Sequence, residues 1–164
     1  VTLRGEKHSF TDISVGTVST NTGIQSTSFE CLLEIDRRAM TNNALNISVF
    51  ASACGKEYTD VCLDLGANSI TIDRANSSLL PKVHKTPVTG ELPPTDGADI
   101  IKLRIFADQS IIEVFVDDET CLTARVYPTL ADSSGIQLRS SNGESVVSSM
   151  QIWEMKAAEI KLKS

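Results

Sequence analysis

Residues 101–128 read IKLRIFADQSIIEVFVDDETCLTARVYP, and this stretch decides the fold. In residues 101–107 apolar side chains alternate with basic ones, which is the period of two of a strand with one buried face. Polar residues at 108–110 suit a tight reversal, and residues 111–116 resume with β-branched and aromatic side chains. A second polar turn at 117–120 precedes another alternating run, which a proline ends. The stretch therefore predicts a three-stranded antiparallel meander.

The alternation also assigns the side chains of this meander to a face. The middle strand, residues 111–116, is largely apolar on both sides, so it should lie centrally. The side chains predicted to point into the core are Leu103, Ile105, Val114, Val116, Leu122 and Val126.

The rest of the chain reads as further short strands separated by turns. Alternating or β-branched runs occupy residues 29–35, 45–51, 61–65, 70–74, 136–139 and 146–155. We interpret Asn21-Thr22-Gly23 as a turn and residues 13–19 as a short first strand. About ten strands without a convincing helix predict an all-β fold, an antiparallel two-sheet β-sandwich of the jelly-roll or lectin-like kind.

A chain of 164 residues fits one domain that is large enough to bury its own core. Residues 1–12 carry charge and little periodicity, so we interpret them as a linker or entry segment. Residues 13–164 then form a single β-sandwich domain, whose last residues, 157–164, are expected to fray or turn helical. The chain begins with Val1 and shows no secretory leader, so we expect a processed or excised piece of a longer protein.

Residues 75–99 show no clear period and contain four prolines, which opposes regular ladder pairing and predicts a long loop. Loops of this length in compact domains are commonly functional or packed against something, so this one is a candidate docking surface. His84 within it is expected to be solvated. Asp73 and Arg74, just before it, are interpreted as a surface salt bridge. Trp153, the one tryptophan, is expected to anchor the core or an interface.

The composition excludes several classes of partner. Hydrophobic residues make up 41% of the chain and charged residues 22%, as in ordinary globular domains. No apolar run approaches the length of a membrane-spanning helix, so no membrane partner is expected. The net charge is −6 and the 15 basic residues are dispersed, so nucleic acid is not an expected partner.

The four cysteines permit two disulfides in three connectivities. They lack close C-x-x-C spacing, which disfavours zinc, and we predict no metal site. Cys31 alternates in phase with apolar neighbours and is expected to be a small buried hydrophobe. Cys54 and Cys62 share a parity on adjacent predicted strands, so they are the better candidates for a disulfide.

Two N-glycosylation sequons occur, at Asn46 and Asn76. Both asparagines are predicted to face solvent, Asn46 from the polar side of a strand. They are candidate glycosylation sites and suggest a secretory route.

Several motifs between Glu57 and Met155, taken in order, together resemble one family. They are EYTDVCLDL, ITIDRANSS, LRIFADQSIIEVFVDD, TARVYPT, SSGIQL and IWEM. This set resembles the C-terminal β-sandwich of glycoside hydrolase family 32, which contains invertases, inulinases, levanases and plant-type fructosyltransferases. The chain departs from the family at Glu119, where many members have glycine after the acidic turn.

The resemblance implies a non-catalytic module of a β-fructofuranosidase-type enzyme. Its partner would be the five-bladed catalytic propeller of the same enzyme, which is absent from this chain and would bind sucrose or a fructan. The implied location is secreted, cell wall or vacuolar, and no cofactor is implied. Homo-oligomerisation, hydrolysis against fructosyl transfer, and the choice of fructoside stay open.

Glycoside hydrolysis needs two carboxylates roughly 5–9.5 Å apart around one bond. Asp108 and Glu113 are the best candidates, with Arg125 as a further polar group for binding. Each carboxylate is equally able to cap backbone groups or to pair with an arginine. The adjacent acidic residues 117–119 are better explained as turn formers. The sequence thus offers weak binding candidates and no convincing catalytic pair.

The three catalytic carboxylates of the family lie in its propeller, in tryptophan-asparagine-aspartate-proline, arginine-aspartate-proline and glutamate-cysteine-proline contexts, and none occurs here. Glu30-Cys31 begins like the last of these, but it lies inside an alternating strand and Leu32 replaces the proline. We therefore predict no catalytic residue in this chain. The alternative function is a free-standing, lectin-like carbohydrate-binding module, although 5% aromatic residues argue against exposed stacking platforms. An independent hydrolase would need a catalytic pair that the sequence does not offer.

Overall fold

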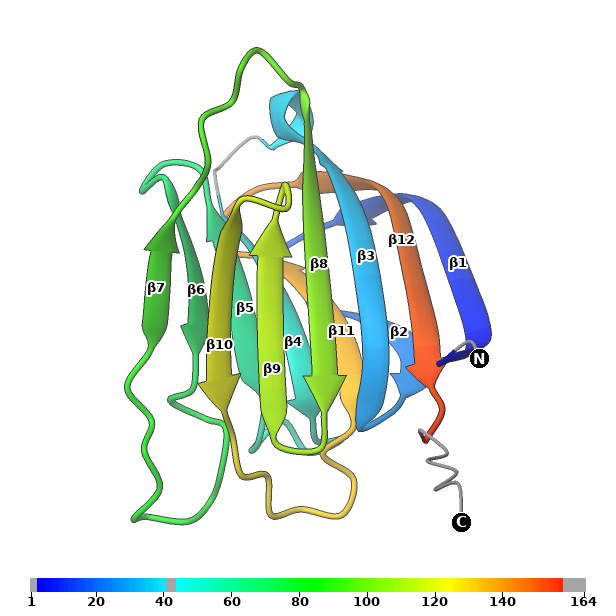
Figure 1. The fold of residues 1–164 in the computed structure, drawn as a ribbon, viewed down its shortest axis with the longest axis vertical. Helices are drawn as coiled ribbons and strands as arrows, with labels where there is room; N and C mark the ends of the chain where they lie inside the picture. The colour runs from blue at the N-terminus through cyan, green and yellow to red at the C-terminus, as the bar shows by residue number, and fades with distance from the viewer. Residues whose placement is uncertain (1–2, 41–43, 158–164) are drawn as a thin grey trace, which may run out of the picture.

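Two antiparallel sheets of six strands each face one another across an apolar core in the computed structural model, which describes residues 3–40 and 44–157 (Figure 1). Sheet A contains, in spatial order, β1 (Arg4–Val15), β12 (Ser145–Met155), β3 (Ser28–Asp36), β8 (Ile100–Asp108), β9 (Ile111–Val116) and β10 (Thr120–Arg125). Sheet B contains β2 (Thr20–Gln25), β11 (Gly135–Ser140), β4 (Ala44–Ala51), β5 (Thr59–Asp64), β6 (Ser69–Asp73) and β7 (Val88–Glu91). The all-β sandwich predicted from the sequence is confirmed.

The predicted meander is β8, β9 and β10, which pair in chain order. Its inward side chains are those assigned by the alternation, because all six residues named above are at most 8% exposed. The strand β9 is less central than expected, since it is the fifth of six strands in sheet A. Its second apolar face is also only partly covered, and Ile111 is 41% exposed.

The β9–β10 turn accommodates its acidic residues by a left-handed backbone. Asp117 and Asp118 have φ angles of 50° and 58°, as the two central residues of a tight hairpin turn require. The Asp117 carboxylate accepts a hydrogen bond of 2.8 Å from the backbone N–H of Lys102. The turn therefore forms with Glu119, and not glycine, after the two aspartates.

The core lies between the inner faces of the two sheets. Phe29 of sheet A meets Phe50 of sheet B edge to face, with ring centroids 6.4 Å apart. Phe50 has a φ of 51° and lies at an irregularity in the β4–β11 pairing. This bulge lets both Val49 and its neighbour Phe50 point inward, because it interrupts the strict alternation of the strand.

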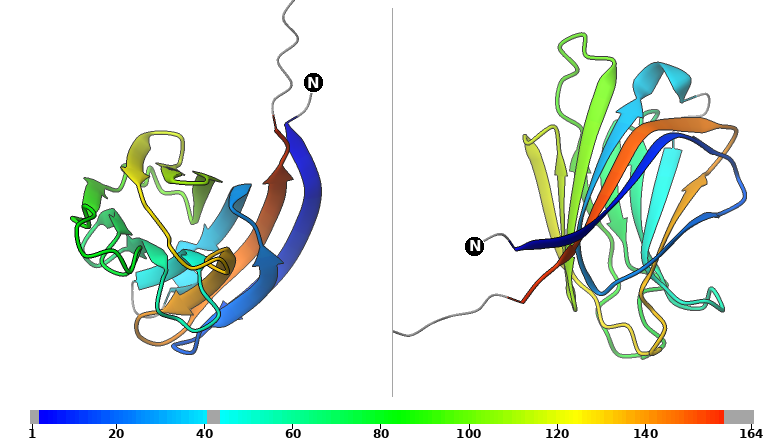
Figure 2. Two further views of the ribbon diagram at one scale, coloured as in Figure 1. Left: turned by 90° about the horizontal axis from the view of Figure 1, so that it is seen from below. Right: turned by 90° about the vertical axis from the view of Figure 1, so that its right-hand side faces the viewer.

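Residues 4–12 are not a linker. From Arg4 onward the chain forms β1, which pairs along β12 at the edge of sheet A (Figure 2). A register shift between Arg4 and Lys7 breaks the alternation, and an edge strand needs few apolar side chains. The interpretation of this segment from its charge was therefore wrong, and β1 extends well before residue 13.

Two other segments contain more strand than the sequence predicted. Asn21-Thr22-Gly23 lies within β2, where Gly23 has a φ of 78°, and is not a turn between strands. The proline-rich stretch 75–99 contains β7, which pairs with β6. A side chain at Gly90 would meet Leu122 at 3.0 Å, so the glycine allows β7 to approach β10 closely.

Arg74 is buried and does not form the predicted surface salt bridge. It is 6% exposed, and its guanidinium donates to the carbonyl oxygens of Thr86 (2.9 Å) and Arg125 (3.1 Å). His84 is exposed, as predicted, but its Nδ1 lies 3.1 Å from Nη2 of Arg74. Arg74 therefore ties the long loop to the end of β10.

The cysteines are all free. Cys31 is fully buried, as predicted, and this burial raises the pKa of its thiol. The predicted disulfide between Cys54 and Cys62 is absent because Cys54 lies in the exposed turn after β4, whereas Cys62 lies on β5 opposite Asn46 and Thr71.

Helical structure in the described part of the chain is limited to the single turn η1 (Arg37–Ala39). Within residues 3–40 and 44–157, no helix has the length and apolar character needed to cross a membrane. The expectation of a frayed or helical tail concerns residues 157–164, of which 158–164 lie outside the described residues.

Candidate functional site

The outer face of sheet A carries a group of aromatic and charged side chains. Strand alternation sends their immediate neighbours into the core and leaves these residues on the other side. The group, called the aromatic face below, consists of Glu30, Leu32, Arg104, Phe106, Phe115 and Trp153. No segment of the described chain crosses it in Figure 1.

Cross-strand pairing makes the aromatic face continuous. Glu30 of β3 lies between Trp153 of β12 and Phe106 of β8. Phe106 and Phe115 form an edge-to-face pair with centroids 6.0 Å apart. Both phenylalanines are only partly covered. Half-exposed aromatic side chains in contact with one another are typical of a surface that binds another protein or domain.

An ion network centred on one buried carboxylate lies within this face. Arg4 donates two hydrogen bonds of 2.7 Å to the carboxylate of Glu30, and Arg104 donates another to the same group. Glu30 is 3% exposed, and the Arg4 hydrogen bonds, supported by those of Arg104, lower its pKa. The Arg4 guanidinium also lies 4.2 Å from the centroid of the Trp153 ring. Glu30 therefore stays ionised and fixes two arginines on the aromatic face.

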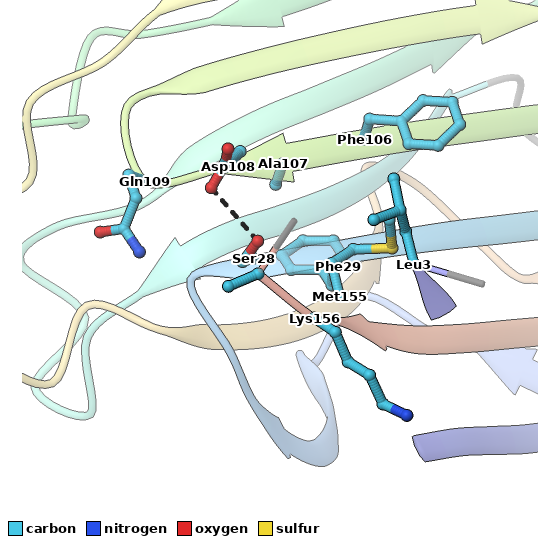
Figure 3. A pocket seen from close by; sticks show the side chains of 10 residues that line it. Leu3, Ser28, Phe29, Phe106, Ala107, Asp108, Gln109, Met155 and Lys156 are labelled. Carbon is cyan, nitrogen blue, oxygen red and sulfur yellow. Dashed lines mark hydrogen bonds between the residues drawn. The ribbon is translucent and has the colours of Figure 1, made fainter. Parts of the chain in front are cut away.

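An open pocket of about 560 Å³ adjoins the aromatic face at the end of β8 (Figure 3). Phe106, Leu3 and Met155 form its apolar wall. Asp108 lies at the opposite side and accepts a hydrogen bond of 3.2 Å from Ser28 Oγ. Lys156 extends away from Asp108 in Figure 3, so the two charges do not meet in this pocket.

The sequence-predicted site residues lie in neighbouring rows on the outer face of sheet A, because Asp108 and Arg125 both pair with Ile111 of β9. Asp108 is exposed at the end of β8. Glu113 is the third residue of β9 and lies between Phe106 of β8 and Thr123 of β10. Glu113 makes no hydrogen bond or ion pair with any described residue. Arg125 donates to Ser110 Oγ at 3.3 Å instead of to either carboxylate.

Catalytic chemistry needs more than this arrangement supplies. A general acid requires burial or a charged neighbour to tune its pKa. Asp108 is exposed, and its carboxylate is hydrogen bonded to a serine. Glu113 is half-buried on the aromatic face, with a phenylalanine and a threonine across the ladder. Asp108 is exposed and Glu113 half-buried, so neither has the dry surroundings that tune one carboxyl group of a glycosidase dyad.

The most completely bound carboxylate is one that sequence reasoning missed. Glu57 is fully buried and has no cationic partner among the described residues. Its two oxygens accept hydrogen bonds from five donors: the backbone N–H groups of Leu79, Thr129 and Leu130, and the hydroxyls of Thr129 and Ser133. Burial raises the pKa of Glu57, but these hydrogen bonds outweigh it and lower the pKa to about 2. Glu57 is a structural anchor that joins three loops.

The two sequons differ in accessibility. Asn76 is exposed, as predicted, and its amide donates to the Tyr58 hydroxyl at 2.9 Å. Asn46 was predicted to face solvent, which is wrong, because it is 6% exposed and donates to Ser141 Oγ at 3.0 Å. Its neighbours on β5 and β11 cover the amide that a glycan would need.

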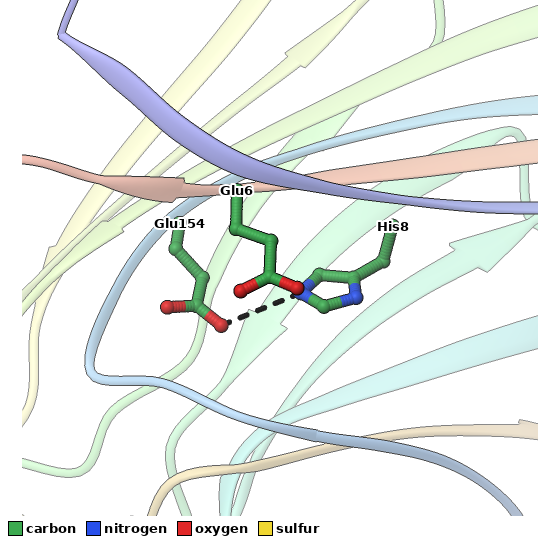
Figure 4. Close-up of side chains that lie close together, drawn as sticks. All are labelled: Glu6, His8 and Glu154. Atoms are coloured by element: carbon green, nitrogen blue, oxygen red, sulfur yellow. Dashed lines mark hydrogen bonds and ion pairs between the residues drawn. The ribbon is translucent and has the colours of Figure 1, made fainter.

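Glu6, His8 and Glu154 form the one group among the described residues with metal-ligand geometry (Figure 4). One ligand atom from each lies within 4.8 Å of the others, and His8 Nε2 is 3.4 Å from Glu154 Oε1. Glu6 is exposed and the other two are half-buried at the edge formed by β1 and β12. A cross-strand pair on a wetted edge accounts for this cluster.

The chain is similar to known proteins over most of its length. The model of the family described as "Glycosyl hydrolases family 32 C terminal" matches residues 1–154. An acid beta-fructofuranosidase from Vicia faba is 34% identical over 111 residues, which cover 65% of this chain and 16% of that protein. A fructan 6-exohydrolase from Beta vulgaris is 32% identical over 121 residues, covering 66% of this chain and 20% of that protein. The chain therefore spans a minor part of these relatives.

Solved structures show the same fold. An exo-inulinase from Aspergillus awamori superposes with a TM-score of 0.80 at 29% identity, covering 94% of this chain and 29% of that one. Fructan 1-exohydrolase IIa from Cichorium intybus gives a TM-score of 0.81 at 17% identity, covering 96% of this chain and 36% of that one. The similarity to the second structure concerns the fold alone.

Proposed function

Since the chain belongs to the C-terminal domain family of the family 32 glycosyl hydrolases, we propose that it is the non-catalytic β-sandwich of a β-fructofuranosidase-type enzyme. Its role in this proposal is to support the catalytic propeller, and the aromatic face is the surface that docks. The parent enzyme would act on sucrose or a fructan, like the fructofuranosidases and fructan hydrolases that this chain resembles. A vacuolar or secreted location is proposed on the same basis, because similar proteins from Rosa and Arabidopsis are described as vacuolar.

The observation that carries this proposal is the unpartnered aromatic face. Partly exposed Phe106 and Phe115 lie beside a buried glutamate, Glu30, that accepts hydrogen bonds from two arginines. Interfaces between domains of one chain bury roughly 600–1,500 Å² and combine such aromatic anchors with arginine. The ion network costs free energy to bury, so it is best explained as a device that fixes side chains at a contact.

Docking can be tested by mixing this 164-residue chain with a separately expressed family 32 propeller and measuring co-elution at micromolar concentration. Phe106→Ser and Phe115→Ser should abolish co-elution while leaving the melting temperature within a few degrees, because both side chains point outward. Thr71→Ser, on the outer face of sheet B, is the matched control and should co-elute like the unmodified chain. Co-elution that survives both phenylalanine changes would refute the aromatic face as the docking surface. Elution of the chain alone at twice its mass would indicate a homo-oligomer instead.

The non-catalytic half of the proposal has its own test. The isolated chain should release no fructose from sucrose or inulin above the background of the buffer. Turnover that is abolished by Asp108→Asn or Glu113→Gln would contradict it, since these are the carboxylates with the best claim to chemistry.

A further inference from the structure

A small polar cup lies on the outer face of sheet B, on the opposite layer of the sandwich from the aromatic face. Its volume is about 220 Å³. Side chains from β4 and β11 form its base, and the turn after β4 forms its rim. The cup is lined mainly by Ser19, Ser48, Ser52, Tyr58, Gln137 and Arg139.

The base of the cup is held by a buried carboxylate. Asp60 of β5 is 8% exposed and accepts hydrogen bonds from Ser48 Oγ at 2.5 Å and from Arg139 Nη2 at 3.4 Å. Burial raises the pKa of Asp60, with the Ser48 hydrogen bond acting in the opposite direction. The Arg139 guanidinium donates to the Asp60 carboxylate at the base of the cup, and this nearby carboxylate disfavours an anionic ligand.

The lining offers both donors and acceptors. Ser19 Oγ donates to Gln137 Oε1 at 2.9 Å, which orients the amide so that its NH₂ group stays available for a ligand. Within the described residues, Arg139 uses its guanidinium for Asp60 alone. The Tyr58 hydroxyl accepts from Asn76 and can still donate. Hydroxyl groups both donate and accept, so a polyhydroxylated ligand matches this set better than a purely acidic or basic one.

The shape limits the size of the ligand. Pockets for drug-sized molecules enclose roughly 300–1,000 Å³, so this one accommodates a single small ring. The Tyr58 ring is half-exposed in the lining and offers an apolar face for the C–H groups of such a ring. We propose that the polar cup of sheet B binds one neutral sugar ring. This site would be distinct from the aromatic face, which lies on the other sheet.

The two tyrosines of the chain provide an internal control, because Tyr58 lines the cup and Tyr127 follows β10 outside it. The 164-residue chain labelled with 3-fluorotyrosine should give two ¹⁹F resonances, assigned with Tyr127→Phe. Fructose, glucose and sucrose are added separately up to about 100 mM, which detects millimolar dissociation constants. The Tyr58 resonance should shift and saturate with at least one sugar, while that of Tyr127 stays in place.

A variant inside the cup tests the contacts themselves. Gln137→Ala should weaken sugar binding about five-fold, as expected for one lost hydrogen bond, without lowering the melting temperature. Lys102→Gln, exposed on sheet A, is the control and should bind like the unmodified chain. A Tyr58 resonance that does not move, or that moves equally with Tyr127, would overturn the proposal. A shift with sodium phosphate but with none of the sugars would also overturn it. Co-elution with the propeller is a separate readout that Gln137→Ala should leave unchanged, so the two proposals can fail independently.

Discussion

Replacing Glu57 by glutamine keeps the shape of a buried side chain and removes its charge. In the native protein all five donors around Glu57 point toward carboxylate oxygens. Leu79 N–H points to one oxygen and Leu130 N–H to the other. A glutamine NH₂ must replace one of these oxygens, and it will then face a backbone N–H that it cannot accept from.

The hydrogen bonds of Glu57 set the expected magnitude for Glu57→Gln. A buried N–H left without an acceptor costs about 1–3 kcal/mol, and the remaining hydrogen bonds lose the strength that the charge gave them. The same hydrogen bonds lower the pKa of Glu57 to about 2, against an ordinary value of 4.5. That difference corresponds to about 3 kcal/mol of stability. We therefore expect Glu57→Gln to lower the free energy of unfolding at pH 7 by about 3 kcal/mol.

The pH dependence has a definite sign. The folded-state pKa is lowered, so the unfolded chain binds more protons between pH 2 and pH 4.5. The contribution of Glu57 is fully present above pH 4.5 and is lost as the pH falls toward 2. The difference in stability between the native protein and Glu57→Gln should therefore be constant from pH 5 to 7 and should shrink below pH 4.5.

The assay is urea unfolding monitored by the fluorescence of the single tryptophan at several pH values between 3 and 7. Glu113→Gln is the matched control, because Glu113 is half-exposed and makes no hydrogen bond with the described residues, and it should change stability by less than about 0.5 kcal/mol. A loss below about 1 kcal/mol for Glu57→Gln, or one that persists unchanged at pH 3, would refute the role assigned to Glu57.

Three further outcomes follow from the buried and exposed groups described above. Arg74→Leu should destabilise the protein by about 1–3 kcal/mol, because two carbonyl groups lose their donor, and limited proteolysis should then cut faster within the long loop. In a eukaryotic secretory host Asn76 should carry a glycan, because it is exposed, and buried Asn46 should not. The intact mass of the Asn76→Gln variant should therefore not change on deglycosylation. Iodoacetamide should modify Cys54 in the native protein, because Cys54 is exposed and the Ser52 hydroxyl lowers the pKa of its thiol. Cys31 is buried and should react only after unfolding. Equal reaction rates for the two cysteines in the native protein would contradict the assigned burial.

The sequence was most informative where one face of a strand is buried and the other wetted. Apolar and basic side chains alternate strictly over residues 101–105, so both the strand and its inward side chains could be predicted. The alternation of apolar and polar side chains does not reveal a strand where a bulge interrupts it, or where an edge position buries few side chains. In β1 a register shift interrupts it, and in β2 the inward side chains are few because the strand lies at a sheet edge. Short β7 is too small for any period to appear.

The site residues were harder to predict for a different reason. Glu57 and Arg74 are buried because loops far away in the sequence close over them, and no local pattern reports that closure. Asp60 alternates like a surface residue, and only the pairing of β4, β5 and β11 shows that it lies beneath Ser48 and Arg139. The outward position of Phe106 and Phe115, in contrast, follows from the alternation itself once the core face is known.

The position of β12 has a consequence for biosynthesis. This strand lies between β1 and β3 in sheet A, although β1 is made first and β12 last among the strands. While a ribosome is still translating the chain, β1 therefore has no neighbour and β3 exposes an unpaired edge, which is a template for aggregation. Pairings between such distant segments also give a high contact order and slow folding. Sheet A can be completed only when residues 145–155 have left the ribosome. A stalled or truncated chain would therefore depend on a chaperone to cover the unpaired edges of β1 and β3.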